Sequence, residues 1–198
     1  QALAADGRSV AGYKPIAARC QETSEGIRNK DALVLQATST LPLSYEEINP
    51  ITCLDEVFHA HATEDINYGV MSSGLRDLSA KADTVVVEGS GGWRVLMNDL
   101  RPYAEWVVQE QLPVVLVVGI KLGCINHAVL TAQAVQQAGL TLAGWIANDV
   151  APPGRRHQEY LATLRRMLPA PLLGEIPHLP QAERAPLGQY LDISLLAQ

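Results

Sequence analysis

The sequence is short of cysteine, positive charge and long apolar runs, and each shortage excludes a class of protein. Its three cysteines, Cys20, Cys53 and Cys124, form no C-x-x-C pair, which disfavours a disulfide framework or zinc site and fits a reducing cytoplasm. The net charge of -6 provides no basic surface for nucleic acid or an anionic membrane. The longest apolar run, residues 112–120, falls short of the ~20 residues of a membrane-spanning helix. A cytoplasmic protein with a small-molecule partner is expected.

Two further features are missing. No basic stretch followed by an apolar one opens the sequence, as a signal peptide would. The run G-x-x-x-x-G-K-[ST], a phosphate-binding loop (P-loop), does not occur in residues 1–198. Residues 1–7 read as the end of a helix capped by Gly7, so we expect a first strand, the P-loop and most of a first helix to be missing.

Apolar segments alternate with helical ones along the chain. Strands are predicted at residues 9–13, 84–87, 113–119, 142–147 and 172–176, and helices at residues 68–82, 101–111, 127–138 and 154–168. The strands at 84–87 and 113–119 lack polar alternation, which indicates burial on both faces. This order predicts an α/β fold with a doubly wound, mostly parallel sheet and helices on both faces. Residues 18–29 are expected to form a loop, and the lack of linkers and repeats predicts one domain over residues 1–198.

Charged residues occur where predicted strands end or helices begin. Glu88 and a glycine-rich turn follow the strand at 84–87, and Lys14 follows the strand at 9–13. Ligands of open α/β sheets bind beyond the carboxyl ends of the strands, so Asp31 and Glu88 could hold Mg²⁺ and Lys14 could neutralise a phosphoryl group. Each residue also has a plainer interpretation: a solvated Glu88, a loop charge at Lys14 and a helix-capping Asp31.

Two other stretches carry reactive residue types. Cys124 and His127 could form a thiol nucleophile, or Cys124 could pack as an apolar residue at a helix start that Asn126 caps, leaving backbone N–H groups to bind a ligand. The acidic stretch around His59 and His61 could be a metal site or a surface loop.

Motifs in order along nearly the whole chain resemble the dethiobiotin synthetase family. They are G-Y-K-P at 12–15, E-G-I-R-N-K-D-A-L at 25–33, V-V-V-E-G-S-G-G-W at 85–93, W-V-V-Q-E-Q-L-P-V at 106–114, K-L-G-C-I-N-H-A at 121–128, G-W-I-A-N-D-V with P-P-G at 144–154, and P-A-P-L-L-G-E-I-P at 169–177. The stretches at 28–36 and 91–102 look more like the second, paralogous form of enteric bacteria.

The resemblance implies a P-loop NTPase-like fold and an ATP- and Mg²⁺-dependent cyclo-ligase, a homodimer, that makes dethiobiotin from 7,8-diaminononanoate and CO2 in biotin biosynthesis. It implies that Lys14 is catalytic and contacts substrate, and that Asp31 and Glu88 bind the metal. The implied nucleotide-binding residues are Asp31, Glu88, Gly89, Ser90 and Gly91 around the phosphates, and Asn148, Asp149, Pro177, His178, Leu179 and Glu183 around the adenine. The other implied substrate-binding residues are Ala18, Cys124 and Asn126.

The sequence departs from the family pattern mainly where the substrate binds. Ala18 replaces a serine, residues 94–97 replace a Thr-Pro-Leu segment, and the region around His59 lacks Ser-Pro-His. These departures leave open a related amide-forming or carboxylating ligase acting on another substrate. A non-enzymatic P-loop ATPase switch is a further alternative, which would need a membrane-targeting helix or a basic face.

Overall fold

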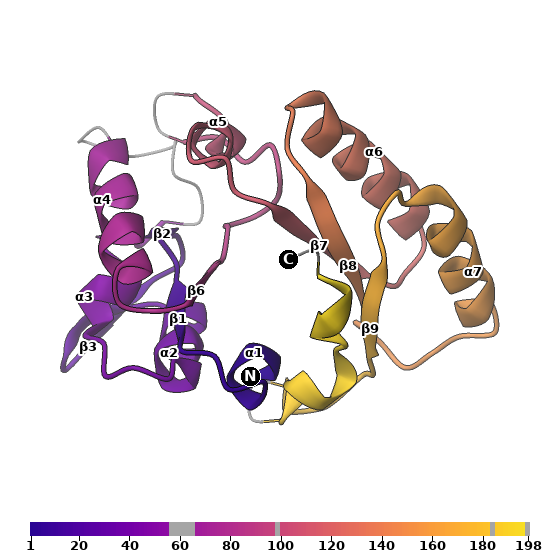
Figure 1. The fold of residues 1–198 in the computed structure, drawn as a ribbon, viewed down its shortest axis with the longest axis horizontal. Helices are drawn as coiled ribbons and strands as arrows, with labels where there is room; N and C mark the ends of the chain where they lie inside the picture. The colour runs from indigo at the N-terminus through magenta and orange to yellow at the C-terminus, as the bar shows by residue number, and fades with distance from the viewer. Residues whose placement is uncertain (56–65, 98–99, 183–184, 197–198) are drawn as a thin grey trace. The chain divides into compact units, whose positions relative to one another are not determined.

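The computed structural model describes residues 1–55, 66–97, 100–182 and 185–196. These residues form two compact units, which we call the N-terminal unit (Leu3–Glu110) and the C-terminal unit (Gln111–Gln198 with Gln1–Ala2) (Figure 1). A short helix, α1 (Ala2–Ala5), has its first residue in the C-terminal unit and its remaining residues in the N-terminal unit. The single domain expected over the whole chain stays a prediction. No helix in the described ranges is both long and apolar enough to cross a bilayer.

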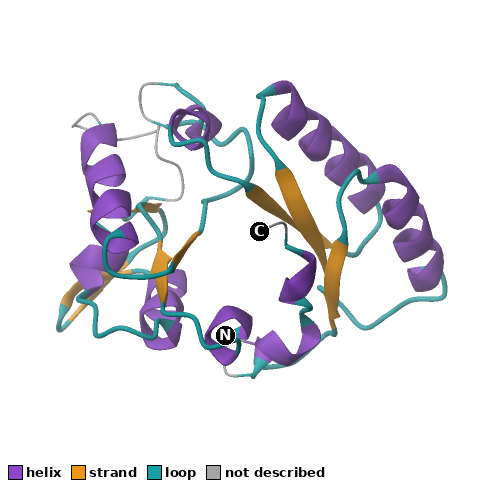
Figure 2. Cartoon of the chain, in the orientation of Figure 1, coloured by secondary structure: helices purple, strands orange, loops and turns teal. Residues whose placement is uncertain are grey.

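The N-terminal unit combines short, mostly parallel strand pairs with helices (Figure 2). Strand β1 (Val10–Tyr13) pairs in parallel with β6 (Thr84–Val87). Strand β2 (Ile16–Ala17) pairs in parallel with β5 (Ile51–Thr52). Strands β3 (Gln21–Thr23) and β4 (Gly26–Arg28) form an antiparallel hairpin. The helices of this unit are α2 (Lys30–Thr38), α3 (Tyr45–Ile48), α4 (Tyr68–Ser79) and α5 (Tyr103–Gln109).

Close packing around β1 fixes the positions of the neighbouring helices. Gly12 lets α2 approach, because a Cβ there would lie 2.7 Å from Leu35 Cβ. Tyr13 is buried, and its hydroxyl donates a hydrogen bond to the Met71 carbonyl of α4 at 2.8 Å. Lys14, the residue that follows β1, therefore lies next to α2.

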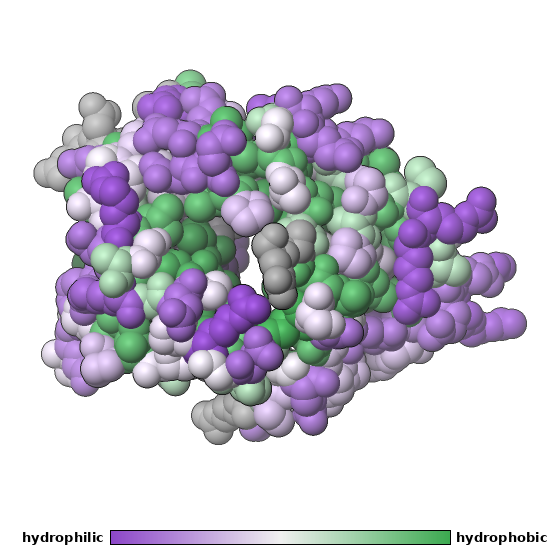
Figure 3. Space-filling model, viewed as in Figure 1, coloured by the Kyte–Doolittle hydropathy of each residue, from purple (hydrophilic) through white to green (hydrophobic). Residues whose placement is uncertain are grey.

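The C-terminal unit is built on a three-stranded parallel sheet with the order β7 (Val114–Gly119), β8 (Leu142–Asn148) and β9 (Leu172–Ile176). Two helices connect the strands, α6 (Cys124–Gln137) and α7 (His157–Met167), and both lie on the same side of the sheet in Figure 1. The chain closes with two 3-10 helices, η2 (Leu187–Tyr190) and η3 (Ile193–Leu195). Figure 3 shows hydrophilic side chains gathered over α7, whose other face is buried through Leu161 and Leu164.

The structure corrects three expectations from the sequence. Residues 18–29 contain the β3–β4 hairpin rather than an irregular loop, because polar, exposed strands give no apolar signal. Helix α6 begins at Cys124 with Gly123 as its N-cap residue at φ 87°, so Asn126 lies inside the helix and does not cap it. The apolar strands are not buried on both faces, because Val86 of β6 is 41% exposed and Val117 of β7 is 57% exposed. An apolar run indicates a strand but not which elements cover its two faces.

Candidate functional site

Lys14 lies at the centre of a charged cluster in the N-terminal unit. Its side chain is only 2% exposed, and its Nζ donates a hydrogen bond to the Gly89 carbonyl at 2.9 Å. The same nitrogen lies 3.3 Å from Glu88 Oε1 and 3.5 Å from Asp31 Oδ2. Lys14 and Glu88 meet because Tyr13 and Val87, the last residues of β1 and β6, are partners in the parallel register. We call Lys14, Asp31, Glu88 and Gly89 the Lys14 cluster.

Asn29 positions Asp31 at the start of α2. It is the N-cap residue, and its side-chain oxygen accepts hydrogen bonds from the backbone N–H groups of Asp31 and Ala32. Its side-chain nitrogen donates to the Ala18 carbonyl at 3.0 Å. The sequence analysis missed Asn29, although an Asn two residues before an acidic residue and an apolar run is a helix-start signal.

The carboxylates of Asp31 and Glu88 both lie beside the buried ammonium of Lys14. Their side chains are 57% exposed at Asp31 and 43% exposed at Glu88, so a hydrated cation can reach both. Burial raises the pKa of Glu88; the Lys14 ammonium opposes this rise, and the Asp31 carboxylate adds to it. Carboxylate oxygens are the ligands that Mg²⁺ prefers, so the donor set and its accessibility fit that ion.

A cavity of about 490 Å³ opens beside the Lys14 cluster. The hairpin, the start of α2 and the glycine-rich turn line it, through Ala18, Arg19, Gln21, Arg28, Asn29, Lys30, Asp31, Ser90 and Gly91. Gly91 adopts φ 85°, a left-handed conformation that favours glycine. The cavity therefore brings together Ala18, Asp31, Ser90 and Gly91, which the sequence assigned separately to substrate, metal and phosphate.

The residues expected to hold adenine lie at the carboxyl edge of the sheet in the C-terminal unit. Asn148 ends β8, Asp149 follows it, and the segment 177–179 (Pro177, His178 and Leu179) follows β9. The Asp149 backbone N–H donates to the Ile176 carbonyl at 2.9 Å, which joins the ends of the two strands. Glu183 lies outside the described residues, as do His59 and His61.

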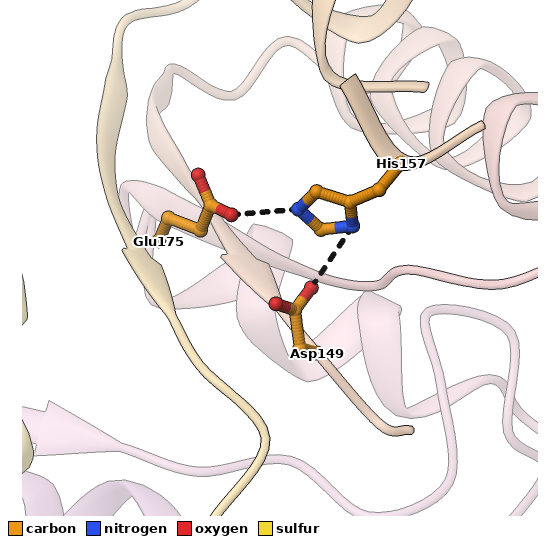
Figure 4. A group of neighbouring side chains, drawn as sticks. All are labelled: Asp149, His157 and Glu175. Carbon is orange, nitrogen blue, oxygen red and sulfur yellow. Dashed lines mark hydrogen bonds and ion pairs between the residues drawn. The ribbon is translucent and has the colours of Figure 1, made fainter. Parts of the chain in front are cut away.

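A second charged cluster lies at this edge. His157, the first residue of α7, places Nε2 2.7 Å from Glu175 Oε1 and Nδ1 3.5 Å from Asp149 Oδ1 (Figure 4). Burial raises the pKa of Asp149 and Glu175 adds to the rise, while His157 and His178 lower it. Each of the three residues offers a ligand atom within 4.8 Å of the others. Each ring nitrogen faces a different carboxylate, however, so these geometries do not converge on one metal ion.

We call Asp149, His157 and Glu175 the His157 cluster. Sequence reasoning assigned no role to His157 or Glu175. The available signal was Glu175 itself, a single carboxylate in the otherwise apolar strand β9. A charge in such a strand needs a partner.

The remaining predicted substrate residues, Cys124 and Asn126, belong to α6 in the C-terminal unit. Cys124 is buried at the start of the helix, and its backbone N–H donates to the Lys121 carbonyl at 3.0 Å. Ala18 belongs to the N-terminal unit. The three predicted substrate-binding residues therefore fall in two units, with Ala18 in one and Cys124 and Asn126 in the other.

Comparison with known proteins gives matches along the whole chain. A sequence model of the AAA domain family matches residues 1–185. The chain is 59% identical to ATP-dependent dethiobiotin synthetase BioD 2 of Salmonella typhimurium, covering 99% of this chain and 85% of that protein. It is 56% identical to BioD 2 of Yersinia pestis, covering 100% and 89%. For BioD 1 of Escherichia coli the identity is 55%, with 99% and 89% covered.

A solved structure also resembles the chain. The cell division protein MinD of Aquifex aeolicus aligns with a TM-score of 0.56 and 14% identity, covering 98% of this chain and 85% of MinD. At that identity the likeness speaks for the fold alone. Together with the AAA domain match, it confirms the predicted α/β fold of the P-loop NTPase type.

Proposed function

Because this chain belongs to the ATP-dependent dethiobiotin synthetase family, we propose that it closes the ureido ring of dethiobiotin from 7,8-diaminononanoate and CO2 in biotin biosynthesis. The observation that supports this chemistry is the Lys14 cluster, in which a buried ammonium lies beside two reachable carboxylates, one of which, Asp31, also lines a polar cavity. The names of the relatives call them ATP-dependent, and in this proposal ATP is the phosphoryl donor.

The reaction needs charge neutralisation and positioning more than a nucleophilic side chain. One amine of the substrate captures CO2 as a carbamate, and a carbamate oxygen attacks the γ-phosphate of ATP, releasing ADP. The second amine then attacks the carbonyl carbon of this mixed anhydride and releases inorganic phosphate. Negative charge builds on the phosphoryl oxygens when the carbamate attacks the γ-phosphate, and Lys14 would stabilise that charge.

The hydrogen bond to the Gly89 carbonyl orients the Lys14 ammonium before substrates arrive. That bond takes one of the three N–H donors of Lys14. The other two donors would be available to the reacting oxygens when Asp31 and Glu88 bind the metal in place of Lys14. Asp31 and Glu88 would hold Mg²⁺, which neutralises phosphate charge when bound.

Other residues supply binding. Ser90 and Gly91, which line the cavity, and Gly89 beside them would contact the phosphates. Asn148, Pro177, His178 and Leu179, at the edge of the sheet in the C-terminal unit, would contact the adenine, and Asp149 would support them from its buried position next to Asn148. Ala18, Cys124 and Asn126 would contact the diamine in a cytoplasmic homodimer.

Phosphate release by the full-length protein tests this proposal. We expect release only when ATP, Mg²⁺, diaminononanoate and bicarbonate are all present, with dethiobiotin detected by mass. Phosphate release that is indifferent to the diamine and bicarbonate contradicts the proposal. A diamine screen by thermal shift then distinguishes a ligase for another substrate, and ATP-dependent binding to DNA or liposomes distinguishes a switch.

A further inference from the structure

The His157 cluster lies beside the edge at which the nucleotide base is proposed to bind. Asp149 directly follows Asn148, and Glu175 lies two residues before Pro177. His157 comes from the connection between the two strands and reaches both carboxylates. Residues from the end of β8, the start of α7 and strand β9 are thus joined at one point.

Asp149 is poorly placed to contact a base. Its side chain is 3% exposed, and among the described residues its Oδ1 has no hydrogen-bond partner. His157 Nδ1 lies 3.5 Å from that oxygen. A buried carboxylate oxygen needs a donor. The doubly protonated imidazolium form of His157 provides one at Nδ1 while its Nε2 donates to Glu175.

We infer that Asp149, His157 and Glu175 form a positioning cluster, in which Asp149 acts through His157 rather than by contacting the base. Glu175 accepts a hydrogen bond from His157 Nε2 at 2.7 Å, which fixes the ring and aims Nδ1 at Asp149. This link supplements the backbone hydrogen bond from Asp149 to Ile176. The cluster thereby ties the carboxyl ends of β8 and β9 together.

The consequence is a fixed geometry for the base subsite. Asn148 ends one tied strand, and Pro177 leaves the other with its restricted φ. The inference rests on the proposed role of Asn148 and residues 177–179 in holding the base. The three cluster residues are therefore positioning residues and not catalytic ones.

Amide hydrogen exchange tests the tie without any ligand. His157→Gln keeps a polar group near the Nε2 position and loses the one facing Asp149, whereas His157→Asn keeps an amide nitrogen near the Nδ1 position. We expect the Asp149 amide, which is hydrogen-bonded to the Ile176 carbonyl, to exchange about tenfold faster in H157Q than in H157N or the wild type. Equal protection in all three proteins overturns the inference.

Glu175→Gln has a matched control on α7. It is expected to accelerate exchange at Asp149 less than H157Q, because a glutamine oxygen can still accept from Nε2. Glu159→Gln makes the same chemical change in an exposed ion pair with Arg156 and is expected to leave the rates unchanged. Equal acceleration by both variants shows a general loosening of α7 and contradicts a role for the cluster.

Calorimetric titration of the full-length protein tests the link to the base. In H157Q we expect ATP to bind about tenfold more weakly and inorganic tripolyphosphate to bind as in the wild type. The double variant D149N/H157Q should bind ATP no more weakly than either single variant, since both act through one contact. Additive losses show that Asp149 contacts the base itself and overturn the inference. A wild type that binds ATP no more tightly than tripolyphosphate refutes the proposed base subsite. In that case hydrogen exchange still tests whether the His157 cluster links the ends of β8 and β9.

Discussion

The Lys14 and His157 clusters each place a nitrogen group between two carboxylates, yet they differ in what solvent can reach. In the Lys14 cluster the nitrogen is buried and both carboxylates remain accessible. In the His157 cluster Asp149 is sealed and only Glu175 is partly exposed. Accessible carboxylates can exchange their protein partner for a ligand, whereas a sealed one cannot. This contrast supports the proposal that similar groups serve chemistry in one unit and geometry in the other.

The sharpest test of this contrast removes the cation of the open cluster. Lys14→Met is expected to lower the ligase rate by about 10²–10³-fold, because transition-state charge on the phosphoryl group loses its neutralising partner. Steady-state phosphate release measures the change, and thermal unfolding checks that the variant is folded. Lys14→Arg retains charge in a different shape and should lose less. A Lys14→Met enzyme with near wild-type rates contradicts a catalytic role for Lys14.

Removing one open carboxylate should change the metal requirement. Glu88→Gln is expected to raise the Mg²⁺ concentration for half-maximal activity at least about tenfold, because a charged ligand becomes neutral. A magnesium titration of the rate measures this. Glu105→Gln, the same change in an exposed ion pair with Arg101, should leave the requirement unaltered. If both variants respond alike, Glu88 is not a metal ligand.

Two strand glycines allow each unit to be perturbed without changing a cluster residue itself. A Cβ at Gly12 would meet Leu35 at 2.7 Å, and one at Gly144 would meet Leu173 at 2.7 Å. Each change to Ala should cost about 1–3 kcal/mol of unfolding free energy through overpacking. Gly12→Ala shifts the helix that carries Asp31, so it should lower kcat, whereas Gly144→Ala should mainly raise KM for ATP. Denaturant unfolding and kinetics measure both, and the reverse kinetic pattern contradicts the division of roles.

The ion pair between Glu47 and Lys81, which lies outside both clusters, shows how much an ordinary ion pair contributes to the free energy of unfolding. Glu47 accepts hydrogen bonds from Lys81 and from the Ser44 backbone N–H, and these lower its pKa. A carboxyl whose pKa is lower in the folded state adds stability above its unfolded pKa and loses it as pH falls through the folded value. Glu47→Gln should therefore cost about 0.5–1 kcal/mol at pH 7 and almost nothing below the folded pKa. Urea melts at the two pH values measure this, and a cost independent of pH contradicts it.

The sequence indicated the open cluster better than the sealed one. Four β-favouring residues followed by Glu88 and glycines mark a strand end, and G-Y-K-P marks Lys14 in the same way. Their contact depends on the β1–β6 register, which parallel pairing made predictable. His157 could not be found in this way, because its partners come from two strands and its own position depends on where α7 begins. The hairpin was missed because Gln21 to Thr23 present only exposed polar side chains.

Asn29 gives the open cluster a property that neither carboxylate has alone. One end of its side chain holds the Ala18 carbonyl in the wall of the cavity, and the other end holds the helix start that carries Asp31. A change that moves the Ala18 backbone would therefore also be felt at the start of α2. Under the roles proposed for Ala18 and Asp31, Asn29 links the diamine subsite to the metal subsite through one amide side chain.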